Sequence, residues 1–205
     1  IDVNFYGTLN LLEMMRIRKI KKIIFISSSG IYGRPKNNVN ENADKNPFNP
    51  YSLGKNLSET LINYYSTHYD IKYVNIRPNL ISGHGLTQDN LIYDIVKSVL
   101  NNQDAVVFGK GTHVRQYTHP DDISSFIKII LKKKLFTNES YNISNNKIQT
   151  ILLIKRIIKL MKKGQIQYIK KNIKTFDLVI SSRKAFNMGW SPKRDIDYMI
   201  KEMIV

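Results

Sequence analysis

The sequence reads NFYGTLNLLEMMRIR at residues 4–18 and KKIIFISSS at residues 21–29. In the first stretch Phe5, Leu9 and Leu12 recur at helical spacing, which predicts a helix. The second stretch is a short apolar run between lysines and serines, which predicts a buried strand. A helix that leads directly into a buried strand is typical of α/β proteins with a parallel sheet.

The same alternation of helix and strand continues along the chain. Periodicity predicts further helices at 51–69, 89–101, 121–133 and 149–162, strands at 71–78, 105–108 and 141–143, and short helices near 182–187 and 195–203. We therefore expect an α/β fold, with a parallel sheet covered by helices on both faces. Ligands of such sheets bind outside the carboxyl ends of the strands, so the loops after Ser29, Pro78 and Phe108 are expected to border the site. The weaker pattern beyond Gly164 predicts a small C-terminal lobe that covers the substrate.

Composition narrows the class of protein. The chain has 205 residues, 42% of them hydrophobic and 23% charged, which fits one globular domain with at most a small appendage. The absence of cysteine excludes disulfides, thiolate metal sites and a cysteine nucleophile. The sequence contains neither a long apolar run nor a signal-peptide pattern. We expect a cytoplasmic protein that does not enter the membrane.

The chain is strongly basic, with 32 Lys+Arg against 16 Asp+Glu. This excess indicates either a polyanionic partner or a coding bias towards lysine, asparagine and isoleucine. The basic residues are spread in short groups such as 19–22 and 132–134, and the sequence contains no recognised DNA-binding motif. Both observations favour the coding bias as the explanation of the charge. A basic protein that binds nucleic acid is the alternative from another functional class, and salt-sensitive retention on DNA would test it.

Three residues form a candidate catalytic set. Tyr51 and Lys55 lie one helical turn apart at the start of an expected helix, so both side chains project from the same face. A free tyrosine is protonated at neutral pH, and a neighbouring ammonium favours the phenolate. Ser28 lies near the end of the strand FISSS, where its hydroxyl can donate to a substrate oxygen. Tyrosine and lysine at this spacing also occur on many solvated helices, so the surrounding motifs decide their meaning.

Histidines add no metal site to this set. His119 and Asp122 belong to the stretch HPDD at residues 119–122. We expect no set of metal ligands around either residue, and a role of His119 as helix cap accounts for both. His84 lies between two glycines, which favours a structural turn. We predict that the protein holds no metal.

Six motifs in order resemble one family. They are NFYGTLNLLE, FISSSGIYG, NPYSLGK, IRPNLISGHG, FGKGTHVRQYTHPDDI and FNMGWSPK. Together they resemble the extended short-chain dehydrogenases/reductases, in particular the NAD-dependent epimerase/dehydratase family and, within it, UDP-glucose 4-epimerases and related nucleotide-sugar epimerases. The resemblance runs essentially from end to end.

The resemblance implies a cofactor, a substrate and a set of site residues. It implies that residues 1–80 form the C-terminal part of a Rossmann-type NAD-binding domain, and that 81–205 contribute the substrate-binding lobe and the last Rossmann elements. The implied substrate is a nucleotide-diphosphate sugar, and a homodimer would form through helices 4–18 and 51–69. The implied catalytic residues are Ser28, Tyr51 and Lys55. NAD would contact Asn4, Ser28, Tyr51, Lys55, Pro78 and Asn79, and the substrate would contact Leu80 and Arg115.

The sequence departs from the family pattern in ways that affect the reaction. Sugar dehydratases of the family carry an Asp-Glu pair after the catalytic hydroxyl, where this chain has Ser29-Gly30. Epimerisation through a transient 4-keto intermediate is therefore favoured, with a reductase, dehydrogenase or decarboxylase of the same fold as alternative. Leu80 replaces an amide found in many epimerases, which leaves the sugar open.

The glycine-rich dinucleotide turn of the family does not occur in this sequence. This absence, and a first residue Ile1 in place of methionine, lead us to expect a truncated chain that by itself binds NAD poorly.

Overall fold

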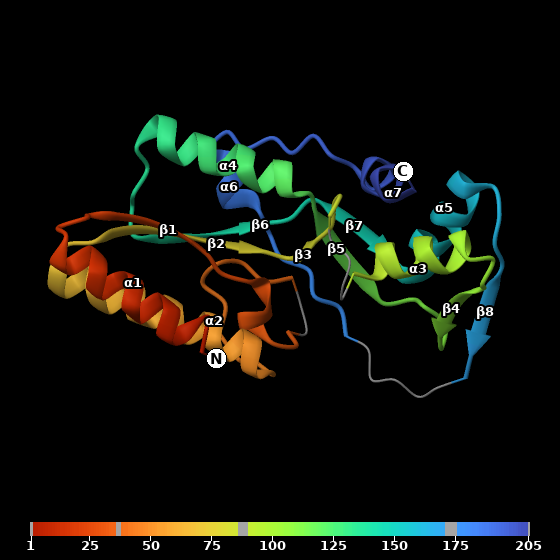
Figure 1. Ribbon diagram of the computed structural model, residues 1–205, viewed down its shortest axis with the longest axis horizontal. Helices are drawn as coiled ribbons and strands as arrows, with labels where there is room; N and C mark the ends of the chain where they lie inside the picture. Colours follow the sequence, from red (N-terminus) through yellow and green to blue (C-terminus); the bar gives the residue numbers. More distant parts are fainter. Residues whose placement is uncertain (1, 36–37, 86–89, 171–175, 205) are drawn as a thin grey trace.

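The structure, a computed structural model, describes residues 2–35, 38–85, 90–170 and 176–204 (Figure 1). Its helices are α1 Phe5–Ile17, η1 Ser29–Tyr32, α2 Pro50–Tyr69, α3 Leu91–Leu100, α4 Pro120–Lys133, α5 Thr150–Met161, α6 Arg183–Asn187 and α7 Ile196–Ile204. Its strands are β1 Lys22–Ile26, β2 Lys72–Pro78, β3 Leu80–Ile81, β4 Ala105–Phe108, β5 Val114–Thr118, β6 Glu139–Ile143, β7 Asn146–Gln149 and β8 Ile166–Ile169. Residue 89, where the third helix was expected to start, lies outside the described residues. Within the described ranges, no helix is both long and apolar enough to cross a bilayer.

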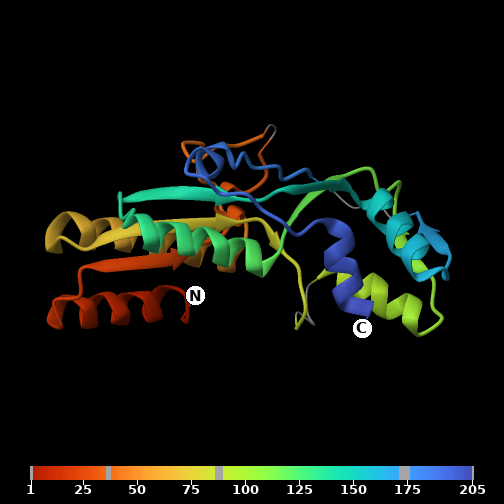
Figure 2. The ribbon, with the colours of Figure 1, turned by 90° about the horizontal axis from the view of Figure 1, so that it is seen from above.

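A parallel sheet with helices on both faces forms the larger part of the molecule. Its strands run in the order β1-β2-β6, and both neighbouring pairs are parallel. Helices α1 and α2 lie side by side under one face, while α4 and α6 cover the other face (Figures 1 and 2). The predicted α/β architecture is thereby confirmed.

The central strand β2 shows why both faces are covered. Tyr73 packs in one apolar cluster with Leu12 of α1 and Ile62 of α2. Its neighbour Val74 belongs to a second cluster that contains Phe126 of α4. Successive side chains of a strand point to opposite faces, and burial of each large apolar side chain contributes roughly 1.5–3 kcal/mol. A strand that buries apolar side chains on both faces therefore needs a helical layer on each side.

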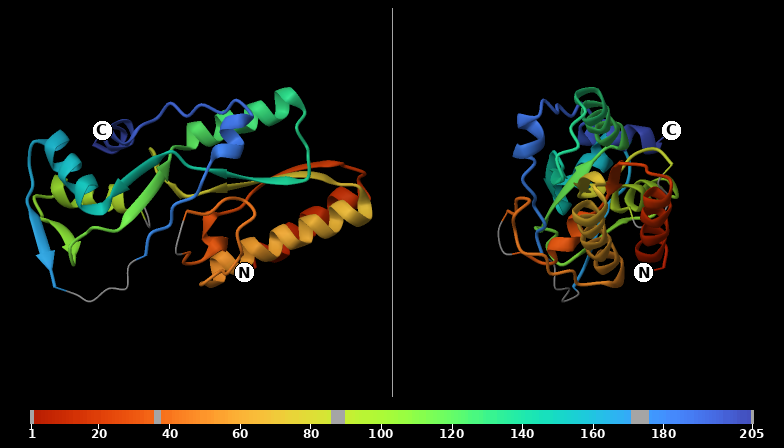
Figure 3. Two further views of the ribbon diagram at one scale, coloured as in Figure 1. Left: turned by 180° about the vertical axis from the view of Figure 1, so that it is seen from behind. Right: turned by 90° about the vertical axis from the view of Figure 1, so that its left-hand side faces the viewer.

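A second lobe extends from the carboxyl end of this sheet (Figures 2 and 3). One apolar core unites α3, α5, α7 and β4, and the partly buried Ile166 of β8 packs against it. Helices α3 and α5 and strand β4 supply much of this core, so the lobe is built from chain segments on both sides of Gly164. The last segment is shared between the two parts, since Ala185 of α6 packs on the first sheet and Met199 of α7 packs in the lobe.

Strand β4 corrects one expectation. It pairs with β8 in a separate two-stranded sheet of the second lobe, so the loop after Phe108 does not share an edge with β1 and β2. The short strands β3, β5 and β7 form a third sheet that connects the two parts. The expected helix cap at His119 is confirmed, because its Nδ1 accepts a hydrogen bond from the backbone N–H of Asp121 at 3.0 Å.

The turn after η1 depends on a glycine. Gly33 has φ +71° and ψ −123°, and a Cβ at this position would lie 2.0 Å from the carbonyl oxygen of Asn46. We expect Gly33→Ala to lower the free energy of unfolding by about 2 kcal/mol or more, because positive φ costs roughly 1–2 kcal/mol and overpacking adds about 1–3 kcal/mol. Urea denaturation would measure the change. Gly7→Ala is the matched control, since its Cβ meets nothing within 4 Å and should be neutral or stabilising; equal stability of the two variants would contradict the prediction.

Candidate active site

Ser28 lies where the chain leaves β1. The backbone stays extended at Ser28, with φ −158° and ψ 147°. Its Oγ accepts a hydrogen bond from the N–H of Gly30 at 3.1 Å and thereby caps η1. A hydroxyl that accepts one hydrogen bond still has its own proton to donate. Ser28 is therefore held in place, and its hydroxyl proton has no acceptor among the residues that the structure describes, so it is available to a ligand.

Tyr51 and Lys55 project from the first two turns of α2. Asn49 caps the helix by accepting a hydrogen bond from the N–H of Ser52 at 2.8 Å, and Pro50 at the first helical position has the backbone angle that a helix requires. Tyr51 is 53% exposed. One turn later, the Lys55 Nζ lies 5.9 Å from the centre of the Tyr51 ring. The predicted pairing of the two side chains on one helix face is present in the structure.

Lys55 also reaches the end of β1. Its Nζ donates to the carbonyl oxygen of Ile26 at 2.7 Å and lies 4.9 Å from the centre of the Phe25 ring. Burial among these groups lowers the pKa of Lys55, because a low-dielectric environment disfavours the charged form. Lys55 thus connects the strand that carries Ser28 to the helix that carries Tyr51.

Two cavities meet at these residues. The first has a volume of about 430 Å³ and is lined by Ile26, Ser27, Ser28, Tyr51, Lys55, Pro78, Asn79, Leu80, Ile81, Asn90, Leu91 and Tyr117. The second has a volume of about 290 Å³ and is lined by Ser28, Ser29, Gly30, Phe48, Asn49, Tyr51, Ser52, Asn79, Leu80, Arg115, Phe176 and Leu178. They share Ser28, Tyr51, Asn79 and Leu80. Seven of the eight residues predicted for the site therefore line these two adjoining cavities, which we call the hollow, at the carboxyl ends of β1 and β2.

Arg115 forms part of the second cavity from β5. Its Nη1 donates to the carbonyl oxygens of Val114 and Phe176, and its guanidinium lies 5.5 Å from the centre of the Phe176 ring. Burial lowers the pKa of Arg115, although a guanidinium keeps its charge at any physiological pH. Arg115 brings a fixed positive charge to this end of the hollow.

Asn4 is the predicted site residue that lines neither cavity. Its carbonyl oxygen accepts a hydrogen bond from the hydroxyl of Ser58 at 2.7 Å, which ties the start of α1 to α2. Contact between Asn4 and a cofactor stays a prediction.

Sequence reasoning missed several residues of the hollow. The hydroxyls of Ser27 and Tyr117 are buried without a hydrogen-bond partner in the described part of the chain, and both residues line the first cavity. Tyr117 stands two residues after Arg115 on the same strand, and that spacing is a signal that could have identified it. Phe176 comes from a segment far away in the sequence, and no local pattern points to it.

The hollow contains no acidic side chain among its described lining residues. At Gly30 a Cβ would lie 2.5 Å from the Oγ of Ser52 and 3.3 Å from the Oγ of Ser28. The hydroxyls, phenol, amine and guanidinium of the site can therefore move a proton and bind anions, but no carboxylate assists them.

Comparison with known proteins identifies the family. Residues 1–144 match the family model described as the NAD-dependent epimerase/dehydratase family. A putative UDP-glucose 4-epimerase of Methanocaldococcus jannaschii is 32% identical over 99% of this chain and 68% of its own length. A UDP-glucuronate 4-epimerase of Thermodesulfobacterium geofontis is 28% identical over 100% of this chain and 64% of its own.

Solved structures agree. The dTDP-glucose 4,6-dehydratase of Bacillus anthracis, in complex with NAD, matches with a TM-score of 0.88 and 26% identity over 99% of this chain and 67% of its own. The UDP-glucuronic acid 4-epimerase of Bacillus cereus, in complex with UDP-glucuronic acid and NAD, matches with a TM-score of 0.89 and 25% identity. This match covers 98% of the present chain and 66% of the epimerase. The chain thus spans about two thirds of the length of these relatives. With matches of this extent in both sequence and structure, the chain belongs to the NAD-dependent epimerase/dehydratase family.

Proposed function

We propose that the whole protein epimerises a nucleotide-diphosphate sugar with NAD as its cofactor, through a transient 4-keto form of the sugar. One observation carries the proposal: Ser28, Tyr51 and Lys55 line the same cavity at the carboxyl end of a parallel sheet. A hydroxyl, a phenol and an amine around one hollow suit the removal of a proton from an alcohol. The names of relatives such as the Bacillus cereus epimerase support the substrate class.

The residues present fit the nicotinamide end of the cofactor. Ser27 and Tyr117 contribute buried hydroxyls without a partner in the described residues, and such groups are costly to leave unpaired. Lys55 uses one donor on Ile26, and an ammonium has three. When bound, NAD would accept a hydride from the sugar carbon and return it to the opposite face. The proposed contacts are Asn4, Ser28, Tyr51, Lys55, Pro78 and Asn79.

The chain's own residues would handle the proton and the charge. Tyr51 would take the proton of the sugar hydroxyl, and Ser28 would donate a hydrogen bond to the same oxygen as it becomes a carbonyl. The Lys55 ammonium would stabilise the negative charge on the Tyr51 oxygen. Arg115 would bind the diphosphate, for which a planar guanidinium is well suited, and Leu80 would contact the sugar.

One feature favours epimerisation over dehydration. Elimination of water needs an acid and a base beside the neighbouring carbons, and the described lining residues include no carboxylate.

The reaction can be tested by product analysis. The whole protein would be incubated with NAD and a series of UDP-, dTDP- and GDP-sugars, with the sugar followed by NMR and NADH by absorbance. We expect inversion at one carbon without net NADH, because the hydride is returned in each cycle. Net NADH in proportion to product would identify a dehydrogenase or decarboxylase instead, and loss of water would identify a dehydratase.

We also propose that two copies associate through α1 and α2. Tyr6, Leu11, Met14 and Leu53 are large apolar side chains on these helices and are each at least 39% exposed. Burial of such side chains favours association. Equilibrium sedimentation should give twice the mass of one chain, and a single-chain mass at all concentrations would exclude the dimer.

A further inference from the structure

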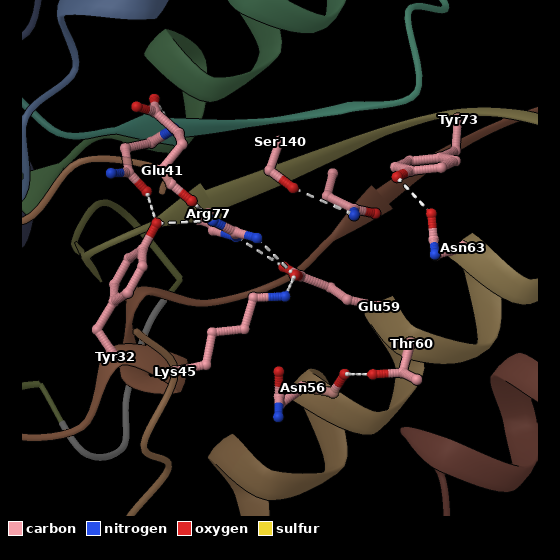
Figure 4. A network of polar contacts seen from close by, with 12 residues as sticks. Tyr32, Glu41, Lys45, Asn56, Glu59, Thr60, Asn63, Tyr73, Arg77 and Ser140 are labelled. Carbon is pink, nitrogen blue, oxygen red and sulfur yellow. Dashed lines mark hydrogen bonds and ion pairs between the residues drawn. The ribbon is translucent and has the colours of Figure 1, made fainter. Parts of the chain in front are cut away.

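A buried ion pair joins Glu59 of α2 to Arg77 of β2 (Figure 4). The Nε of Arg77 donates to the Oε1 of Glu59 at 2.8 Å, and its Nη2 donates to the Oε2 at 2.7 Å. The two side chains are only 4% and 2% exposed. Lys45 adds a third charge, with its Nζ 2.8 Å from the same Oε2. Both oxygens of the Glu59 carboxylate are thus held in a fixed geometry.

Arg77 also binds the segment that follows Ser28. Its Nη1 donates to the hydroxyl of Tyr32 at 2.8 Å and to the carbonyl oxygen of Glu41 at 3.0 Å. Tyr32 in turn donates to the Oδ1 of Asn142 on β6 at 2.7 Å. One guanidinium therefore contacts α2, η1 and the loop between them.

The position of these contacts in the fold connects them to the site. Glu59 lies one helical turn after Lys55 on α2, and Arg77 immediately precedes Pro78, which lines the first cavity. Tyr32 ends η1, whose first turn Ser28 caps. The two segments that carry the candidate catalytic set, η1 with its cap Ser28 and α2 with Tyr51 and Lys55, thus converge on the Arg77 side chain. Arg77 does not itself line either cavity.

The charges are well compensated. Burial by itself would lower the pKa of Arg77, but the hydrogen bonds and charge of Glu59 raise the pKa above its ordinary value. Burial by itself would raise the pKa of Glu59, but Arg77 and Lys45 more than offset it and hold the pKa below its usual range. Both groups therefore stay ionised near neutral pH.

Stability alone does not explain such a pair. The cost of taking two ions out of water offsets much of their attraction, and apolar pairs of similar volume are often as stable. The bidentate contact does, however, restrict geometry, because a guanidinium fixes both the distance and the angle of the carboxylate that it binds. An apolar pair at the same place would allow α2 to shift along β2.

We infer that Arg77, held by Glu59, is a positioning residue that sets the first turn of α2, and with it Tyr51 and Lys55, relative to Ser28. The inference rests on the proposed function for its catalytic consequence. Misplacement of reacting groups by about 1 Å can cost about 10²-fold in rate, so a smaller shift should still be measurable.

The double variant Arg77→Met with Glu59→Leu tests this inference, because it removes the pair without leaving a buried charge. In the whole protein we expect kcat to fall by about tenfold or more, while KM and the melting temperature change little. Hydrogen exchange of the Ser52 and Leu53 amides, which bond to Asn49 at 2.8 and 2.9 Å, should become faster. Arg77→Lys keeps the charge but loses the fork, and should lower kcat in the same direction.

The matched control is the double variant Arg156→Met with Asp197→Leu. This pair is also bidentate but lies in the second lobe, and its loss should change neither kcat nor the exchange of the two amides. Unchanged kcat in a folded Arg77→Met, Glu59→Leu variant would overturn the inference, and so would full activity in Arg77→Lys. If the Arg77→Met, Glu59→Leu variant does not fold, the kcat of Arg77→Lys alone decides. If the unmodified protein turns over no nucleotide sugar, the proposed function fails, and unchanged amide exchange would separately exclude the positioning role.

Discussion

Replacing Tyr51 with Phe is expected to lower kcat for epimerisation by about 10²- to 10⁴-fold, the usual contribution of a positioned acid or base. The variant removes one oxygen and keeps the ring, so the packing at the first turn of α2 should not change. Tyr51 lines both cavities, and no other described lining residue except Tyr117 carries a phenol. Tyr117 lines only the first cavity, and Lys55 lies beside the ring of Tyr51, so we expect Tyr51 to be the phenol that takes the proton.

Steady-state kinetics with the preferred sugar would measure this loss. KM and the affinity for NAD should stay within a few-fold, because the missing group acts mainly in the transition state. Tyr64→Phe is the matched control, since Tyr64 lies on the same helix, is 50% exposed and lines neither cavity. Near-parental turnover in Tyr51→Phe would show that another group takes the proton.

Replacing Lys55 with Met should lower kcat by about 10²- to 10³-fold, because the charge that would stabilise the Tyr51 oxygen is lost. Methionine keeps an unbranched side chain of similar length and removes the charge that lies 4.9 Å from the centre of the Phe25 ring. Lys72→Met provides the control, since Lys72 lies at the opposite end of β2 and pairs with Asp70 at 3.0 Å. A Lys55→Met enzyme with normal kcat would contradict the role of the ammonium.

The pH dependence provides a second test of Lys55. Burial lowers its pKa, so the ammonium is lost as the pH rises through a value below that of an ordinary lysine, and kcat should fall over the same range. Between the folded and unfolded pKa values the unfolded chain binds more protons, so this residue makes the free energy of unfolding increase with pH there. In Lys55→Met, both this contribution to stability and this limb of the rate profile should be absent. A rate that declines at alkaline pH equally in both proteins would exclude Lys55 as the titrating group.

The candidate catalytic set was largely predictable from the sequence because its geometry is local. Tyr51 and Lys55 lie one helical turn apart, and helical periodicity alone places them on one face. Ser28 directly follows a short apolar run that predicts a buried strand, and parallel strands bring their carboxyl ends to one edge. The six ordered motifs then indicated the family, and the comparisons confirmed it.

The tertiary structure decided everything that depends on pairing over long distances. Nothing local indicates that Glu59 and Arg77, 18 residues apart, meet in a buried pair, or that Arg115 reaches the carbonyl of Phe176, 61 residues away. The sequence predicted that β4 belongs to the main sheet, whereas it pairs with β8. The residues of a short apolar strand do not indicate which strand it pairs with. Periodicity and spacing thus determined the elements and the common helix of Tyr51 and Lys55. Strand partners, the second lobe and the Glu59–Arg77 pair depend on packing between distant segments, which no local pattern encodes.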